Sequence, residues 1–311
     1  MSERILILLI ILLPSITYSQ RRWNQPKYEG VINFGVTNFL GELGGADGVG
    51  SDFLKDMELA MTHGAVGIGI RYKLTELTSF KGTLTYGMVR GDDALTNNKA
   101  RNARNIHFRS PIIEIATQFE YVFIKEKNFY RYGKRKIKGS NFFQSLTAYT
   151  FVGLGVFGFN PKAQVTINGN RSGPWLALQP YNTEGQGLPG RGKPYSRVNI
   201  SIPIGVGFKY RVDGNWSVGF ELGVRKTFTD YIDDVSTTYW IPDSLSKYYG
   251  ENSALLSNPG GENLLTVTFG SSNEIFPQTR GDPKDNDSYI FFLFNINKKL
   301  RKTRSFSPRL R

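Results

Sequence analysis

The sequence has no cysteine, only two histidines, and no long apolar run beyond its N-terminus. Without cysteine, the chain forms no disulfide and no thiolate metal site, and it cannot receive the lipid anchor of a lipoprotein. Support for a Ser-His-Asp arrangement is thin, because His63 and His107 have no carboxylate near them in sequence and no Gly-x-Ser-x-Gly motif occurs. The glycine string from Gly41 to Gly45 is not followed by Lys-Ser or Lys-Thr, which excludes a phosphate-binding loop. Nothing in the sequence predicts a cofactor.

The one apolar run identifies a secretory signal peptide. Arg4 precedes nine apolar residues, Ile5 to Leu13, and a small-residue stretch ends at Ser19. As a helix this run would span about 14 Å, whereas crossing a bilayer takes about 20 residues. We therefore expect residues 1–19 to be a signal peptide that is cleaved near Ser19 or Gln20.

The remaining chain is rich in glycine and aromatic residues, with 34 Gly, 22 Phe and 16 Tyr. Between Arg197 and Arg211 every even position from 198 to 210 is apolar, and the odd positions are polar or small, apart from Pro203. A period of two with one apolar face is typical of a strand that is buried on one side. Asp213-Gly214-Asn215 then predicts a tight turn into a second strand of the same kind.

Eight segments fit this template, and we expect them to form one antiparallel barrel over residues 20–297. They are 30–39, 66–73, 80–88, 113–123, 146–156, 197–211, 216–225 and 289–296. Alternation alone does not distinguish a transmembrane barrel from a soluble one with its apolar face inward. The second and sixth segments are followed by short turns, whereas long loops follow the first, third, fifth and seventh. This asymmetry favours an eight-stranded antiparallel transmembrane β-barrel with long extracellular loops.

Charged residues on the polar face would then point into a narrow lumen. They are Arg71, Lys81, Glu114, Glu120, Glu221 and Arg225. Eight strands leave only enough interior space for side chains, so we expect these charges to pair with one another as a structural core. A narrow pore or a buried carboxylate site is the alternative.

The basic residues are unevenly distributed along the chain. Two segments, 125–138 and 298–311, contain seven basic residues each and a single acid, Glu126, and together they account for the net charge of +13. In the expected topology both segments lie on the periplasmic side. We interpret them as a docking surface for an acidic periplasmic partner, with a solvated tail or contact with anionic lipid headgroups as alternatives. Nucleic acid is excluded as a partner by this location. The predicted partner-binding residues are Lys125, Lys127, Arg131, Lys134, Arg135, Lys136, Lys138, Lys298, Lys299, Arg301, Lys302, Arg304, Arg309 and Arg311.

The predicted external loops carry acidic clusters, which could bind outer-membrane lipopolysaccharide through bridging cations. The cluster from Asp230 to Asp234 lacks the ligand spacing of a calcium loop, so we predict no dedicated metal site. Its Asp and Thr side chains are expected to order the loop by bonding neighbouring backbone amides.

Two motifs resemble those of the DUF6089 family of outer-membrane barrels. One is Thr37 to Gly45 after the first strand, and the other is Thr229 to Tyr239 after the seventh, with Thr229, Asp230, Asp233, Asp234, Ser236, Thr237 and Thr238 as its polar residues. That family includes PorG-like components of the type IX secretion system. The resemblance implies a barrel that contacts periplasmic secretion-ring proteins and serves protein transport and gliding motility. The basic tail after Asn297 departs from barrels that end at a terminal aromatic residue.

The sequence therefore predicts a non-enzymatic outer-membrane barrel that anchors or docks a periplasmic assembly. One alternative is a passive or adhesive protein that acts through loops 161–195 and 229–287. A barrel enzyme is a weaker alternative.

Overall fold

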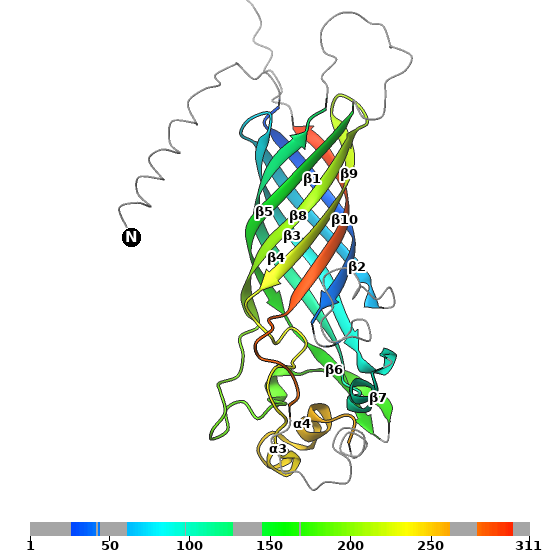
Figure 1. Cartoon of the computed structure of the whole chain (residues 1–311), viewed down its shortest axis with the longest axis vertical. Coiled ribbons are helices and arrows are strands. Elements are labelled where there is room, and N and C mark those ends of the chain that lie inside the picture. The colour runs from blue at the N-terminus through cyan, green and yellow to red at the C-terminus, as the bar shows by residue number, and fades with distance from the viewer. Residues whose placement is uncertain are drawn as a thin grey trace, which may run out of the picture.

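The computed structural model describes residues 26–41, 43, 61–96, 98–126, 145–167, 169–261 and 279–300. Within these residues, eight antiparallel strands form a closed barrel (Figure 1). Its strands follow the order β3-β2-β1-β10-β9-β8-β5-β4, and pairing between β3 and β4 closes the sheet. Their bounds are β1 Tyr28–Leu40, β2 His63–Lys73, β3 Thr78–Asp92, β4 His107–Ile124, β5 Leu146–Phe159, β8 Val198–Arg211, β9 Trp216–Thr227 and β10 Ser288–Leu300.

Each strand expected from alternation is present, and most extend further than the pattern indicated. The short connections are also confirmed, at residues 74–77 and 212–215. In the second of these, the Asp213 carboxylate accepts hydrogen bonds from the backbone amides of Asn215 at 2.6 Å and Trp216 at 2.7 Å. Aspartate side chains commonly close turns in this way.

Which face of the strands points outward decides between the two kinds of barrel that alternation left open. Ile115 and Leu154 point outward and are 66% and 67% exposed, whereas Lys81 and Glu114 point inward and are fully buried. The soluble alternative, with its apolar face inward, is therefore wrong. In the segment 289–296, Ile290 has the same outward parity as the exposed Phe292, but it lies near the loop end and is buried.

The two ends of the barrel differ. We call the end that carries connections 93–106, 160–197 and 228–287 the loop end, and the end where β1 begins and β10 finishes the turn end. Additional elements extend the loop end (Figure 1). They are η3 Asp93–Leu95, α2 Lys99–Arg104, β6 Lys162–Ile167, β7 Asn170–Ala177, η5 Gln179–Tyr181, α3 Pro242–Tyr249 and α4 Glu251–Ser257. Among the described residues, no helix is both long and apolar enough to cross a membrane.

An apolar core lies where the loops meet the barrel. Inward-facing aromatic side chains such as Phe157 and Phe291 pack with Phe39 and Phe108, whose rings are 4.9 Å apart and nearly perpendicular. Ile232 and Val235, from the connection after β9, belong to the same fully buried cluster. Because burial of apolar surface stabilises a structure by about 25 cal/mol per Å², this cluster fastens the loops to the barrel wall.

Candidate functional site

The lumen near the turn end is filled by a network of buried ion pairs. Arg71 Nε lies 2.6 Å from Glu120 Oε2, and Arg71 Nη1 lies 3.1 Å from Glu29 Oε2. Lys81 Nζ lies 2.5 Å from Glu221 Oε1 and 3.4 Å from Glu120 Oε1. All five side chains are almost completely inaccessible to solvent. Charges at such depth must be paired to offset their desolvation, and the predicted salt-bridged interior is confirmed here.

A second ion pair occupies the lumen nearer the loop end. Arg225 Nε lies 3.4 Å from Glu114 Oε1, and the Arg225 guanidinium stacks over the Phe291 ring at 4.5 Å. Glu114 Oε2 also accepts hydrogen bonds from Tyr289 at 2.7 Å and Ser201 at 3.2 Å. The six interior charges that the sequence analysis named thus form two separate groups.

Glycine makes room for large side chains inside the barrel. A Cβ atom on Gly207 would lie 2.3 Å from the ring of Tyr149, which is closer than real Cβ contacts allow. Tyr149 also donates a hydrogen bond to Glu221 Oε1 at 2.5 Å. The tyrosine therefore joins the wall to the ion-pair network, and a larger residue at 207 would displace it.

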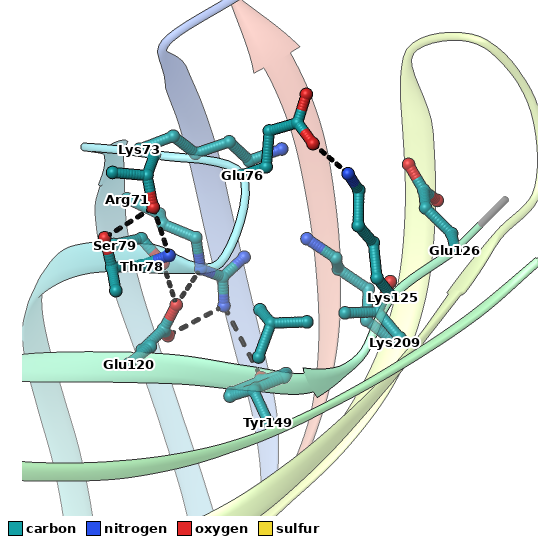
Figure 2. A pocket seen from close by; sticks show the side chains of 13 residues that line it. Arg71, Lys73, Glu76, Thr78, Ser79, Glu120, Lys125, Glu126, Tyr149 and Lys209 are labelled. Atoms are coloured by element: carbon teal, nitrogen blue, oxygen red, sulfur yellow. Dashed lines mark hydrogen bonds and ion pairs between the residues drawn. The ribbon is translucent and has the colours of Figure 1, made fainter. Parts of the chain in front are cut away.

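A recess of about 60 Å³ opens at the turn end, above the first network (Figure 2). Its lining is mixed in charge, with Arg71, Lys73, Lys125 and Lys209 facing Glu76, Glu120 and Glu126. Figure 2 shows Lys125 reaching across the opening toward Glu76, with which it forms an ion pair. Deeper in the recess, Lys209 Nζ lies 3.2 Å from Glu29 Oε2, and Lys73 pairs with the same carboxylate. This balance of charges gives the recess no strong preference for an anion or a cation.

Three of the predicted docking residues fall within the described residues, and all three lie at the turn end. Lys125 follows β4, while Lys298 and Lys299 are near the end of β10. Lys298 Nζ lies over the Trp216 ring at 4.9 Å. The other predicted docking residues lie outside the described part of the chain, namely Lys127, Arg131, Lys134, Arg135, Lys136, Lys138, Arg301, Lys302, Arg304, Arg309 and Arg311.

The two basic segments meet at the barrel mouth through their single acid. Glu126 Oε1 lies 3.9 Å from Lys299 Nζ and 3.4 Å from Arg211 Nη1. Glu126 belongs to the first segment and Lys299 to the second, although 173 residues separate them in the sequence. All three side chains are only partly exposed, and a single carboxylate cannot neutralise the 14 basic residues of the two segments, so these contacts bring the segments together and leave them strongly basic.

At the opposite end, the Thr229 to Tyr239 motif forms part of an ordered cap. Its side chains bond neighbouring amides as predicted: Thr229 Oγ1 accepts from Tyr231 N at 3.3 Å, and Asp233 Oδ1 accepts from Val235 N at 2.9 Å. Asp234 adopts a positive φ of 68°, a backbone region that aspartate tolerates better than most residues.

The remaining motif residues are held by partners in other loops. Glu184 accepts hydrogen bonds from the backbone amides of Ser236 at 2.9 Å and Thr237 at 3.1 Å, and from Thr237 Oγ1 at 2.6 Å. Arg280 Nη1 lies 3.1 Å from Glu184 Oε1, and Arg280 Nη2 lies 3.8 Å from Asp234 Oδ2. Arg191 donates to Thr238 Oγ1 at 2.7 Å. The motif therefore acts as the meeting point of the loops after β5 and β9.

Burial changes the pKa of Asp234, the acid at the centre of this cap. Desolvation raises the pKa of Asp234 to about 6, although the Arg280 guanidinium and hydrogen bonds from Thr183 and Tyr195 favour its charged form. Those hydrogen bonds are 2.5 Å and 2.7 Å long. A carboxylate so completely enclosed has no access to an external substrate, and its role in this structure is to hold loops together.

Asp92 lies opposite His107 in the register between β3 and β4, a pairing that the sequence did not reveal. Both groups already have other partners: Arg171 binds both oxygens of Asp92, and His107 Nε2 accepts from Gln164 N at 3.1 Å. The described residues contain no group of three or more His, Asp or Glu side chains placed to hold a metal ion.

Sequence reasoning missed the β6–β7 hairpin and the roles of Glu184 and Arg280. The hairpin extends the sheet from β4 through the pairing of Arg109 with Lys162. Its second strand, Asn-Arg-Ser-Gly-Pro-Trp-Leu-Ala, contains Gly173 and Pro174 in its middle and shows no apolar alternation. Because proline within a sheet is confined to edge strands, the sequence of this segment indicated a loop and not a strand.

No protein-family model matches the chain, and no curated protein matches it in sequence. Solved structures to which it is similar include neisserial surface protein A, at 9% identity over 88% of this chain and 96% of that chain, with a TM-score of 0.37. Ail of Yersinia pestis is 8% identical over 88% and 98% of the two chains, with a TM-score of 0.34. The N-terminal barrel domain of Pseudomonas aeruginosa OprF is 10% identical over 88% and 99%, with a TM-score of 0.30. The assignment as a closed eight-stranded barrel follows from the chain's own strand pairing.

Proposed function

We propose that this protein is an integral outer-membrane barrel that docks a periplasmic assembly through its basic turn end. Support for the membrane location comes from the outward face, where side chains such as Ile68, Ile115 and Leu154 are more than 60% exposed. An isolated apolar residue on a protein surface is ordinary, but a continuous apolar band around a barrel is a membrane-facing surface. The long loops then lie outside the cell, and the turn end faces the periplasm.

The observation that carries the docking role is the contact of Glu126 with Lys299 and Arg211 across the barrel mouth. It brings the starts of two segments with seven basic residues each to one face. A concentrated positive field of this kind steers acidic partners and weakens with salt. The partner is therefore an acidic periplasmic protein surface, and the barrel supplies its membrane anchor.

The resemblance of the Thr37 to Gly45 and Thr229 to Tyr239 motifs to DUF6089 barrels supports a more specific proposal. In it, the docked assembly is the periplasmic ring of a type IX secretion system, and the protein serves protein transport and gliding motility. The proposal gives the barrel no chemical reaction to catalyse and no cofactor.

A pull-down from detergent-solubilised outer membranes tests the docking role. Three forms are compared: wild type, a variant with the 14 basic residues of the two segments changed to Gln, and a charge-preserving variant in which Lys and Arg are exchanged at the same positions. We expect a periplasmic partner to co-purify with the wild type and the charge-preserving variant and to be lost from the Gln variant. Equal recovery with all three forms would refute electrostatic docking, provided that all three insert in the membrane.

A surface-binding or adhesive role is the second candidate, and the ordered cap favours it. Glu184, Asp234 and Arg280 join loops that would otherwise be independent, giving a fixed external surface. If this role is the main one, binding to a host or neighbouring cell surface will be lost when the cap is disrupted and retained when the basic turn end is neutralised.

A further inference from the structure

Three basic side chains line up across the outer wall near the loop end. Arg90 on β3 is the register partner of Arg109 on β4, and Arg109 is in turn the register partner of Lys162 on β6. Directly paired residues in an antiparallel sheet share one face, with Cα atoms about 5 Å apart. We call Arg90, Arg109 and Lys162 the basic row.

The basic row faces away from the lumen. Arg90 has the same parity as the exposed Leu84 and Tyr86, and Arg109 the same as the exposed Ile113 and Ile115. All three basic residues are partly exposed, whereas the residues beside them, Val89, Ser110 and Ala163, are buried. The row is therefore accessible from outside the barrel wall.

Its position coincides with the edge of the apolar band. The register pair next to Arg90 and Arg109 on the same face is Met88 with Pro111, and the pair after it is Tyr86 with Ile113. Same-face neighbours along a strand are about 7 Å apart, so the row lies one step beyond the apolar surface. In a membrane this is the level of the lipid headgroups.

The charges of the row are not neutralised within the described structure. No salt bridge to a described carboxylate is formed by Arg90, Arg109 or Lys162, and the nearby Asp92 is bound through both oxygens by Arg171. Like charges placed directly opposite each other destabilise a sheet. The protein thus maintains a repulsive arrangement at a surface where an anionic ligand would relieve it.

Trp175 on β7 fixes the central residue of the row. The Arg109 guanidinium carbon lies 3.9 Å from the centroid of the Trp175 ring. Stacking of this kind holds the planar group in place while leaving its N–H donors free for the two-point hydrogen bonding that suits phosphate. Tryptophan itself is favoured at membrane interfaces, where its ring is apolar and its N–H is polar.

From these observations we propose that the basic row binds a phosphorylated lipid headgroup of the outer leaflet, the chemical class to which the lipid A of lipopolysaccharide belongs. The site differs from the turn-end docking surface and lies at the opposite end of the barrel. It rests on the proposed outer-membrane location and not on the docking role. The lipid would order the β6–β7 hairpin against the membrane surface, because Lys162 and Trp175 both belong to that hairpin.

Native mass spectrometry of the purified full chain tests the site. The wild type is compared with R90Q/R109Q/K162Q and with a control, K193Q/R197Q/K226Q, which removes the same charge from exposed loop-end residues outside the row. Bis-phosphorylated lipid A is the probe, and dephosphorylated lipid A and inorganic phosphate are the comparison ligands. Since each basic residue near an anionic membrane surface contributes about 1 kcal/mol, loss of three should weaken lipid binding about 100-fold.

We expect the wild type and the control to retain bis-phosphorylated lipid A, and the row variant to lose it. Dephosphorylated lipid should bind weakly to all three forms, and inorganic phosphate at equal concentration should not displace the lipid. Equal binding by the row variant and the control would overturn the proposal, and displacement by inorganic phosphate would show a general anion site instead. Insertion of each form is checked by its heat-dependent gel shift, so a failure of the outer-membrane location is seen separately from a failure of lipid binding.

Discussion

The substitution Lys81→Met tests the idea that the lumen is a structural core. Lys81 is fully buried, and its Nζ atom lies 2.5 Å from Glu221 and 3.4 Å from Glu120. Removing one partner of a buried ion pair typically costs about 3 to 5 kcal/mol, because the other charge remains buried without compensation. Here Arg71 Nη2 still lies 3.6 Å from Glu221 Oε1, so we expect a loss of about 3 kcal/mol in the free energy of unfolding.

The double variant K81M/E221Q distinguishes the cost of losing the Lys81–Glu221 ion pair from the cost of burying the Glu221 charge without its lysine partner. With both charges gone, Arg71 and Glu120 can still pair, and we expect the double variant to be more stable than K81M alone. The measurement is urea unfolding of the refolded barrel in lipid vesicles, followed by tryptophan fluorescence. Leu84→Met, on the outward-facing side of the same strand, serves as a control and should cost less than about 1.5 kcal/mol.

Two results would refute this reasoning. A cost below about 1 kcal/mol for K81M would mean that water reaches the lumen and solvates Glu221. Strictly additive effects in the double variant would mean that the two residues do not interact, since coupling within a contact pair is measured by the failure of additivity.

Three further predictions concern the cap and the lumen wall. Glu184→Ala leaves the buried Arg280 without its closest carboxylate, so the loops should become sensitive to protease while the barrel keeps its heat-dependent gel shift; unchanged protease resistance would contradict the role given to Glu184. Burial raises the pKa of Asp234 from 3.8 to about 6, so its contribution to cap stability is fully present below about pH 4 and is lost as the pH rises through 6. The cap should resist protease better at pH 5 than at pH 8, and Asp234→Asn should flatten that dependence. Gly207→Ala places a methyl group against the Tyr149 ring and should cost about 1 to 3 kcal/mol in urea unfolding, whereas Gly64→Ala, at a position with open space around it, should cost less.

The sequence by itself determined the strands and the division of their side chains between two faces. A strand exposes successive residues to opposite faces, so the alternation from Val198 to Tyr210 fixed the strand and assigned its residues to an apolar and a polar face. Which of the two faces points outward was decided only by the tertiary structure. The placement of Arg71, Lys81 and Glu221 on the polar face followed from the same parity. The net charge of the two basic segments was also a purely local property.

Tertiary structure decided which distant residues meet. Glu184 and Arg280 are 96 residues apart and neither belongs to a periodic pattern, so their joint hold on the Thr229 to Tyr239 motif depends on how two long loops fold over the barrel. The basic row likewise exists only because the register of β3, β4 and β6 places Arg90, Arg109 and Lys162 side by side. Register is set by turn geometry and by packing across the whole sheet, and a shift of one residue would send Arg90 into the lumen.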